Sequence, residues 1–454
     1  MSEVNTSSIP TLSPVADGVP HARNAALLSV VAAGLGQLYN RQFGKGVLLL
    51  AMYAIGLFFV ITRLGHAIWG LTTLGEQKQQ LKLVGKVYQP VAGDHSIFLM
   101  VQGLIVLFVA MLLVLLYAAA IRDAYRTGKL REQGNQPNRF ADTIRYVNDK
   151  WFPYMIVSPP LLFVLFFTVL PIVFSILIAF TDYSSPNHLP PANLVNWVGL
   201  TNFLDLFQLS AWAKTFYGVF TWTMTWAVLS TVTTFFGGFG IALLVQQKFI
   251  RFKSFWRTLY MLPFAIPSFV SLLIMRNFFN TQFGPVNQYL RWFGIEGPEW
   301  LADPFWAKVT VLIVNFWLGF PISMLLIMGI LTTIPREQYE AAEVDGASPI
   351  QRFRMITFPG VMYSLAPILI GTFAGNVNNF GVIFLLTGGN PTNSEYQFAG
   401  ETDLLITWLY KLSITNGKYN FASVISIIIF VIIAGLSIWN FRRTKAFKEE
   451  ETYR

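Results

Sequence analysis

The chain has 454 residues, of which 54% are apolar and only 12% are charged, and Phe alone contributes 41. A soluble protein of this length cannot bury that much apolar surface and still cover its exterior with charge, and a disordered chain would be poor in apolar residues. The composition therefore predicts a multi-pass membrane protein. The net charge of +9 is assigned to basic cytoplasmic loops and not to nucleic-acid binding, and the absence of Cys excludes disulfides and thiolate metal sites.

Eight apolar runs are long enough to cross a bilayer core of about 30 Å as helices. In chain order they cover 47–65, 97–121, 153–180, 222–245, 259–275, 309–331, 366–386 and 422–439. The fifth run contains Pro263 and Pro267, which predict a kink, with helix packing or gating as its role. An earlier run over 25–39 is short and rich in Gly, and we expect an interfacial or re-entrant segment there. The predicted fold class is all-α, a transmembrane bundle of about eight spans.

Basic residues are unevenly distributed between the loops. If the N-terminus is cytoplasmic, 22 of the 32 Lys and Arg fall in inner segments and 10 in outer loops. Since cytoplasmic loops carry the excess of basic residues, both termini are predicted to be cytoplasmic. The polar segment 122–150 marks the main predicted boundary. The expected regions are 1–46 (cytoplasmic N-terminus with the interfacial segment), 47–150 (accessory two-span region and linker), 151–441 (six-span core) and 442–454 (cytoplasmic tail).

The sequence lacks the motifs of a self-sufficient enzyme. The four His are not spaced as metal ligands, and no phosphate-binding G-x-x-x-x-G-K-[ST], G-x-S-x-G or H-E-x-x-H pattern occurs. Ionisable residues are almost absent from the predicted spans, which argues against a proton-driven carrier. Two rival classes are retained: a secondary sugar transporter, which should show inverted repeats, and a membrane-embedded transferase, for which Glu401 and Asp403 are the available acids.

The loop over 335–359, between the sixth and seventh runs, predicts two short helices on the cytoplasmic side. Pro335 suits a first helical turn, and Gly346 suits the left-handed residue that ends a helix. Ser348 can cap a second helix, which Pro359 is expected to stop. Such a helix–Gly–helix unit would be a rigid projection that transmits force to a docked partner.

Several segments resemble a known family. Glu340-Ala341-Ala342, Asp345-Gly346-Ala347 and Pro359 resemble the EAA loop of ABC importer permeases, which in that family docks into the ATPase subunit. Further resemblance to the maltose/maltodextrin (MalF-like) sugar permeases is carried by Gly34–Gln42, Trp197–Phe203, Asn315–Pro321, Phe373–Phe380 and Thr402–Leu405. The best-known member has a large folded domain after its third span, whereas the loop 181–215 is short, so contacts of that domain are not carried over.

The resemblance implies an ABC type I importer permease that moves maltose- or maltodextrin-type oligosaccharides across a bacterial or archaeal cytoplasmic (inner) membrane by alternating access. It implies a second homologous permease chain (MalG-like), an ATPase dimer (MalK-like) that binds ATP and Mg, and an extracytoplasmic sugar-binding protein (MalE-like). This chain would bind no cofactor or metal and would not be an enzyme. Another sugar or polyol is the alternative within this class. The residues implied in ATPase coupling are Glu340, Ala341, Ala342, Asp345, Gly346 and Pro359.

Amide and hydroxyl side chains within the sixth and seventh runs suit a sugar, because an amide both donates and accepts hydrogen bonds. Asn376 and Asn379 are three residues apart, so they are expected on one helical face, which Thr372 joins. The resemblance implies a substrate site made by Asn315, Leu318, Gly319, Thr372, Gly375, Asn376 and Asn379. The alternative is that these Asn side chains bond neighbouring helices. Trp222 and Trp226 are interpreted as an interfacial belt, with a sugar-stacking platform as the alternative.

Overall fold

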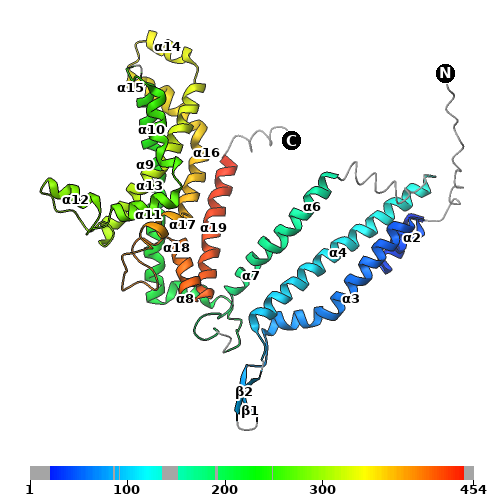
Figure 1. The fold of residues 1–454 in the computed structure, drawn as a ribbon. Helices are drawn as coiled ribbons and strands as arrows, with labels where there is room; N and C mark the ends of the chain where they lie inside the picture. The colour runs from blue at the N-terminus through cyan, green and yellow to red at the C-terminus, as the bar shows by residue number, and fades with distance from the viewer. Residues whose placement is uncertain are drawn as a thin grey trace, which may run out of the picture. The chain divides into compact units, whose positions relative to one another are not determined.

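The computed structural model describes residues 21–84, 87–91, 93–134, 152–189, 193–247 and 249–443. Within these ranges seven helices are long and apolar enough to cross a membrane, and one bent helix pair supplies an eighth segment. These segments follow the eight predicted runs in order, which confirms the helical, multi-span prediction (Figure 1). Residues 1–20 of the predicted N-terminal cytoplasmic segment and residues 444–454 of the predicted cytoplasmic tail lie outside the described residues.

The chain forms two compact units, which are described separately. Unit 1 comprises residues up to Leu177 together with Pro186–Trp197, and unit 2 comprises Ile178–Ser185 and Val198 onward. The assignment of 151–441 as the six-span permease core stays a prediction. The elements of unit 1 are α1 (His21–Val31), α2 (Leu35–Tyr39), α3 (Phe43–Thr73), β1 (Gln80–Val84), β2 (Val87–Val91), α4 (Ser96–Glu132), α6 (Phe152–Val164), the π-helical turn η1 (Leu165–Val169) and α7 (Leu170–Ile178), whose last residue belongs to unit 2.

The segment before the first span folds back as α1 and α2 and packs against α4. The Gln37 amide donates to the backbone oxygen of Ala120 at 2.8 Å and to the Asp123 carboxylate at 3.0 Å. Gly36 is required here, since a Cβ would lie 2.1 Å from the backbone oxygen of Ala25. The run at 25–39 is therefore a pair of short packed helices, and its position in the membrane remains a prediction.

The antiparallel hairpin β1–β2 was not predicted from the sequence. Its register pairs Gln80 with Val91 and Val84 with Val87. The alternation of polar and apolar residues in Gln80–Val84, followed by Gly85, is typical of a strand leading into a turn and was the available signal.

Unit 2 is a helical bundle with α9, α13 and α16 at its centre (Figure 1). Its elements are α8 (Thr201–Gln208), α9 (Ser210–Gln246), α10 (Lys253–Ala265), α11 (Ser268–Phe278), α12 (Pro285–Trp292), α13 (Pro304–Thr333), α14 (Arg336–Val344), α15 (Pro349–Arg352), the π-helical turn η2 (Phe353–Thr357), α16 (Phe358–Val377), α17 (Phe380–Leu386), α18 (Leu405–Tyr410), the π-helical turn η3 (Lys411–Thr415) and α19 (Tyr419–Arg443).

Glycines bring α9 and α13 into close contact. A Cβ at Gly238 would lie 2.6 Å from the backbone nitrogen of Met324 and 2.9 Å from the backbone oxygen of Phe320. A Cβ at Gly237 would lie 2.1 Å from the Phe316 ring. The sequence Gly237-Gly238-Phe239-Gly240 thus permits the close helix packing that small residues give in membranes.

We expect Gly238→Val to destabilise unit 2 by about 1–3 kcal/mol, because the new side chain meets backbone atoms that cannot move aside. Thermal unfolding of the purified chain in detergent measures this loss. Gly240→Val is the matched control, since a Cβ at Gly240 meets no described atom within 4 Å. Equal stability of the two variants would contradict the packing argument.

Two of the predicted spans are broken. The fifth run forms α10 and α11, which meet at 88°, because the chain leaves the helix at Ile266 and Pro267. The seventh run is not one helix over 366–386: α16 ends at Val377, and α17 starts afresh at Phe380.

The prediction that Pro359 stops a short helix is wrong. α15, η2 and α16 form one helix of 29 residues from Pro349 to Val377, and Pro359 lies in the first turn of α16. The π-helical turn over Phe353–Thr357 alters the backbone hydrogen-bond pattern just before it. The ring of Pro359 is therefore accommodated without ending the helix.

Candidate functional site

A cavity of about 210 Å³ lies between α9, α13 and α16 within unit 2. Its polar lining consists of Thr231, Thr234, Asn315, Ser323, Thr372 and Asn376. Its other side chains are apolar, and Gly319 is also part of the wall. None of the residues that line this cavity carries a charge, so the site suits a neutral polar molecule with both hydroxyl groups and apolar faces.

Asn376 is held at the cavity wall by two residues of α9. Its side-chain nitrogen donates to the Thr231 hydroxyl at 3.0 Å, and its backbone oxygen accepts from the Trp226 indole nitrogen at 3.1 Å. Thr231 in turn donates to the backbone oxygen of Ala227. The side-chain oxygen of Asn376 makes no hydrogen bond with the described residues and is left as an acceptor.

Asn315 lies in the middle of α13 and is 8% exposed. Its side-chain amide makes no hydrogen bond with any described residue, although an amide in an apolar setting is costly when it is unpaired. Gly319, one turn later, lies against α9, where a Cβ would approach the Thr234 methyl to 2.7 Å. A ligand in the cavity could therefore bond the whole side-chain amide of Asn315 and the side-chain oxygen of Asn376.

The structure brings together four of the seven predicted sugar-site residues: Asn315, Gly319, Thr372 and Asn376. Leu318 packs instead into an apolar cluster with Trp226 and Val314. Gly375 is exposed and does not line the cavity. Thr231, Thr234 and Ser323 also line the cavity but were not predicted from the sequence. The spacing of the two Thr residues, which places them on one face of α9, was the available signal.

The prediction that Asn379 shares a helical face with Asn376 is wrong. The helix stops between them, and Asn379 is the N-cap of α17, where its side-chain oxygen accepts from the backbone nitrogen of Val382 at 3.3 Å. Asn is favoured at such a cap because it satisfies an otherwise unpaired amide at the helix start.

The two Trp residues of α9 are buried and do not form an interfacial belt. Trp226 is 0% exposed and Trp222 is 9% exposed. The Trp222 indole donates to the backbone oxygen of Thr402 at 3.1 Å. The two side chains therefore fasten α9 to the loop before α18 and to the end of α16.

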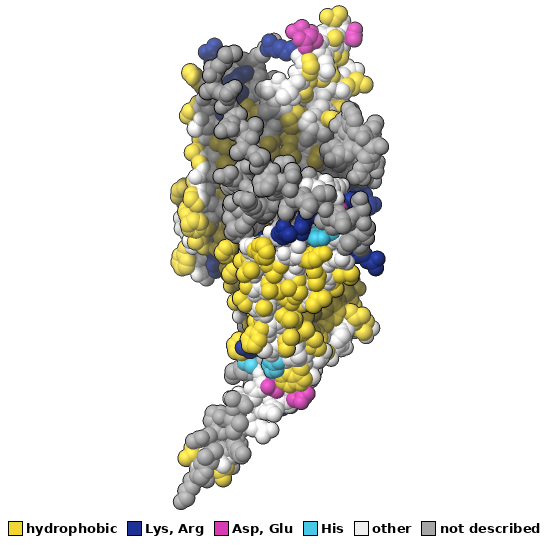
Figure 2. Space-filling model, turned by 90° about the vertical axis from the view of Figure 1, so that its right-hand side faces the viewer, with side chains coloured by type: hydrophobic (Ala, Val, Ile, Leu, Met, Phe, Trp, Pro, Cys, Tyr) yellow, Lys and Arg dark blue, Asp and Glu magenta, His cyan; other side chains and the backbone are white. Residues whose placement is uncertain are grey.

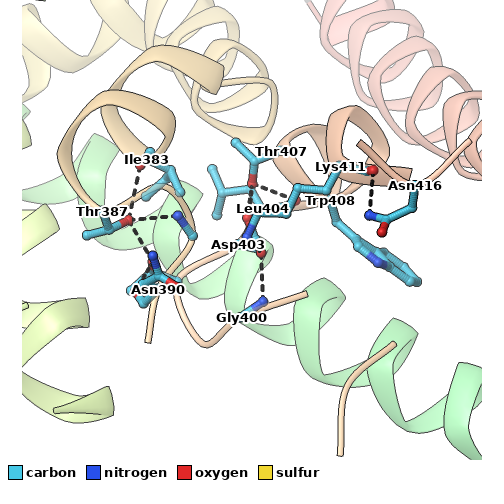
Figure 3. A network of polar contacts seen from close by, with 12 residues as sticks. Ile383, Thr387, Asn390, Gly400, Asp403, Leu404, Thr407, Trp408, Lys411 and Asn416 are labelled. Atoms are coloured by element: carbon cyan, nitrogen blue, oxygen red, sulfur yellow. Dashed lines mark hydrogen bonds and ion pairs between the residues drawn. The ribbon is translucent and has the colours of Figure 1, made fainter. Parts of the chain in front are cut away.

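A buried polar network holds the loop before α18 (Figure 3). Asp403 accepts from Lys411 at 2.6 Å, from the backbone nitrogen of Gly400 at 2.7 Å and from the Thr407 hydroxyl at 2.9 Å. Glu401 accepts from Lys308 at 2.6 Å. Both acids of the transferase alternative are thus engaged in structural ion pairs, which disfavours that class.

The loop between α13 and α16 forms a projection at one end of unit 2 (Figure 1). Gly346 ends α14 with a φ of +76°, as predicted. Ser348 caps α15: its hydroxyl accepts from the backbone nitrogen of Gln351, and its own backbone nitrogen donates to the Gln351 side chain at 2.7 Å. Pro335 precedes α14 as its N-cap and is not in the first turn.

Two side-chain contacts fix the fold of this projection. The Tyr339 hydroxyl lies 2.9 Å from the Thr357 hydroxyl, and Arg352 donates to Glu343 at 3.1 Å. The projection is thereby joined to the helix that reaches Asn376.

The surface of the projection is largely exposed. Val344, Ile350 and Met355 are 88%, 67% and 79% exposed, respectively. Apolar side chains set among charged residues are typical of a surface that docks onto another protein. Among the predicted coupling residues, Ala342 is half-buried and the others are exposed: Glu340, Ala341, Asp345, Gly346 and Pro359.

Comparison with known proteins decides the family. Residues 236–444 match the model of the binding-protein-dependent transport system inner membrane component. A galactooligosaccharides transport system permease protein, GanP, from Bacillus subtilis is 37% identical, and the match covers 94% of this chain and 99% of that protein. This chain belongs to the family of binding-protein-dependent sugar importer permeases. It is a multi-pass membrane protein of an ABC importer.

Other relatives agree with this assignment. A maltodextrin transport system permease protein, MdxF, from Bacillus subtilis is 36% identical over 94% of this chain and 97% of its own length. The maltose/maltodextrin permease protein MalF from Klebsiella aerogenes is 40% identical, but over 55% of this chain and 49% of that protein. A crystal structure of a bacterial ABC transporter involved in alginate import matches with a TM-score of 0.54 and 22% identity, covering 66% of this chain and 99% of that chain. This last likeness supports the fold alone.

Proposed function

We propose that this chain lines the membrane pathway of an importer for neutral oligosaccharides of the maltose and maltodextrin type. The observation that carries the proposal is the uncharged cavity between α9, α13 and α16, in which the Asn315 amide lacks a described partner. Sugar hydroxyls would pair with the amides and hydroxyls, and the apolar walls would contact the C–H faces of the rings. The names of the maltodextrin permease relatives support the same substrate class.

The proposed partners are a second homologous permease chain, a dimer of ATPase subunits that holds ATP and Mg, and an extracytoplasmic sugar-binding protein. A solved neighbour at 22% identity is described as a transporter in complex with a pentasaccharide-bound periplasmic protein, which supports the last of these. The chain is proposed to lie in the cytoplasmic membrane with both termini inside. This orientation places the α14–α15 projection on the side where ATP is available.

The continuous helix from Pro349 to Val377 supports a mechanical link between the projection and the cavity. At 1.5 Å per residue it spans roughly 40 Å, from the exposed docking surface to Asn376. A movement of the projection with a closing ATPase dimer would therefore displace one wall of the cavity. In an alternating-access cycle, that displacement would switch the side from which the sugar is reached.

A galactooligosaccharide is the second candidate substrate, because GanP matches over 99% of its length. The two substrate classes share neutral rings and hydroxyls, so the cavity chemistry alone accepts both. An acidic oligosaccharide is disfavoured, since no residue that lines the cavity is basic.

The test is ATP turnover by the assembled complex in lipid nanodiscs, supplied with its binding protein and a panel of sugars. We expect maltodextrins to stimulate turnover and a uronic-acid oligosaccharide of equal length to leave it at the basal rate. Stimulation by galactooligosaccharides alone would favour the second candidate. Stimulation by the acidic sugar alone would overturn the proposal.

A further inference from the structure

Unit 1 contains a second, chemically different cavity between the start of α3 and the C-terminal half of α4. Its volume is about 560 Å³. Lys45, Arg122, Asp123 and Arg126 line its polar side, and Leu49 and Leu116 line its apolar side. It shares no lining residue with the sugar cavity, and the transport function does not account for it.

Two of the three basic side chains in this cavity are not paired with its one acid. Lys45 pairs with Asp123 at 2.6 Å, and the other oxygen of Asp123 accepts from Gln37 at 3.0 Å. The one acid of the site is therefore already engaged. Arg122 and Arg126 are exposed and make no hydrogen bond or ion pair with the described residues.

The spacing of the two arginines suits an anion with several oxygens. Residues four apart lie on one face of a helix, so both guanidinium groups can reach the same ligand. Each guanidinium presents a planar set of donors that matches the oxygens of a phosphate group.

The cavity lies where the apolar surface of unit 1 ends. No charged residue occurs between Ile97 and Ile121 of α4, and Arg122 follows directly; on α3, Lys45 precedes an uncharged stretch that reaches Thr62. Leu48, Met52 and Ile55 of α3 are 44–71% exposed beyond the cavity. Figure 2 shows a broad band of apolar side chains on unit 1, with basic side chains beside it. In a bilayer, this border is the level of the lipid headgroups.

We propose that this cavity binds the phosphate headgroup of an anionic phospholipid, with the acyl chains lying along the apolar surfaces of α3 and α4. Free phosphate shares the headgroup chemistry but makes no use of Leu49, Leu116 and the adjoining apolar surface. The lipid is therefore the source that fits both sides of the cavity.

The test is native mass spectrometry of the full-length chain in detergent, titrated with phosphatidylglycerol or phosphatidylcholine of equal acyl length. We expect a tightly retained phosphatidylglycerol, and we expect the double variant Arg122→Gln, Arg126→Gln to bind it on the order of tenfold more weakly. Arg251→Gln with Arg257→Gln is the matched control, because it removes two exposed arginines outside the cavity and should leave binding unchanged.

A further variant, Arg122→Lys with Arg126→Lys, keeps the charge and should retain part of the affinity, which separates headgroup binding from a folding defect. Thermal unfolding of each variant is measured alongside. Equal phosphatidylglycerol binding by the Gln variant and the native chain would overturn the proposal. Equal binding of both lipids would do so as well, as would displacement of the lipid by millimolar inorganic phosphate.

Discussion

Gly346→Val is expected to reduce sugar uptake to background while the chain still inserts and folds. Gly346 has a φ of +76° at the end of α14, a conformation that costs a β-branched residue about 1–3 kcal/mol. The turn would relax to another geometry and displace α14 from α15, so the docking surface that carries Val344 and Ile350 would be lost. Sugar uptake and ATP turnover by the reconstituted complex are the two measurements.

Two controls separate this effect from a general loss of fold. Gly346→Asn should keep most of the uptake, since Asn tolerates the left-handed conformation. Gly435→Val places the same side chain in α19, where a Cβ meets no described atom within 4 Å. Native uptake in the Gly346→Val variant would contradict a coupling role for this turn.

Asn376→Ala is expected to weaken sugar transport by about one to two orders of magnitude. The substitution removes a side chain that lines the cavity and leaves the Thr231 hydroxyl without its donor, and an unmade buried hydrogen bond costs about 1–3 kcal/mol. Uptake measured against sugar concentration checks this. Asn315→Ala should act in the same direction, since its amide also lines the cavity.

Asn378→Ala is the matched control for this site. Asn378 is exposed, lies two residues further along the chain and does not line the cavity. Its replacement should leave uptake unchanged. If Asn376→Ala and Asn378→Ala transported alike, Asn376 would have no part in the sugar site.

Much of the fold could be predicted from the sequence because its signals are local. The apolar runs are set by the bilayer thickness, and the ends of α14 and α15 are set by Gly346 and Ser348, whose backbone preferences act within a few residues. The broken fifth span followed from its two prolines in the same way.

The errors arose where another feature of the structure overrides a local sequence signal. Pro359 is a strong local stop signal, yet the π-helical turn before it lets the helix continue to Val377. Asn379 has the spacing of a helical partner for Asn376, yet it caps a new helix. Trp is a residue type common at membrane edges, yet the Trp226 indole is buried and donates a hydrogen bond to the backbone oxygen of Asn376, near the end of α16.

In the candidate site, too, some residues could be predicted from the local sequence and others could not. Asn315 and Asn376 could be singled out from the sequence because polar groups are rare in spans, whereas Gly319 was implied only by the resemblance to sugar permeases. The residues on α9 were missed because a Thr on a helix commonly bonds its own backbone, and only the packing of three helices shows that Thr231 and Thr234 share a cavity with Asn315.

Cross-linking from the α14–α15 projection in the assembled complex tests whether this projection docks onto the ATPase subunit. Since the chain has no Cys, Ala341→Cys places a single thiol on the exposed face of α14. We predict that a short bifunctional reagent joins this thiol to the nucleotide-hydrolysing subunit and that the yield changes when ATP is added. A thiol that reacts only with reagents supplied from outside the cell, or that never cross-links to that subunit, would contradict a cytoplasmic coupling role for the projection.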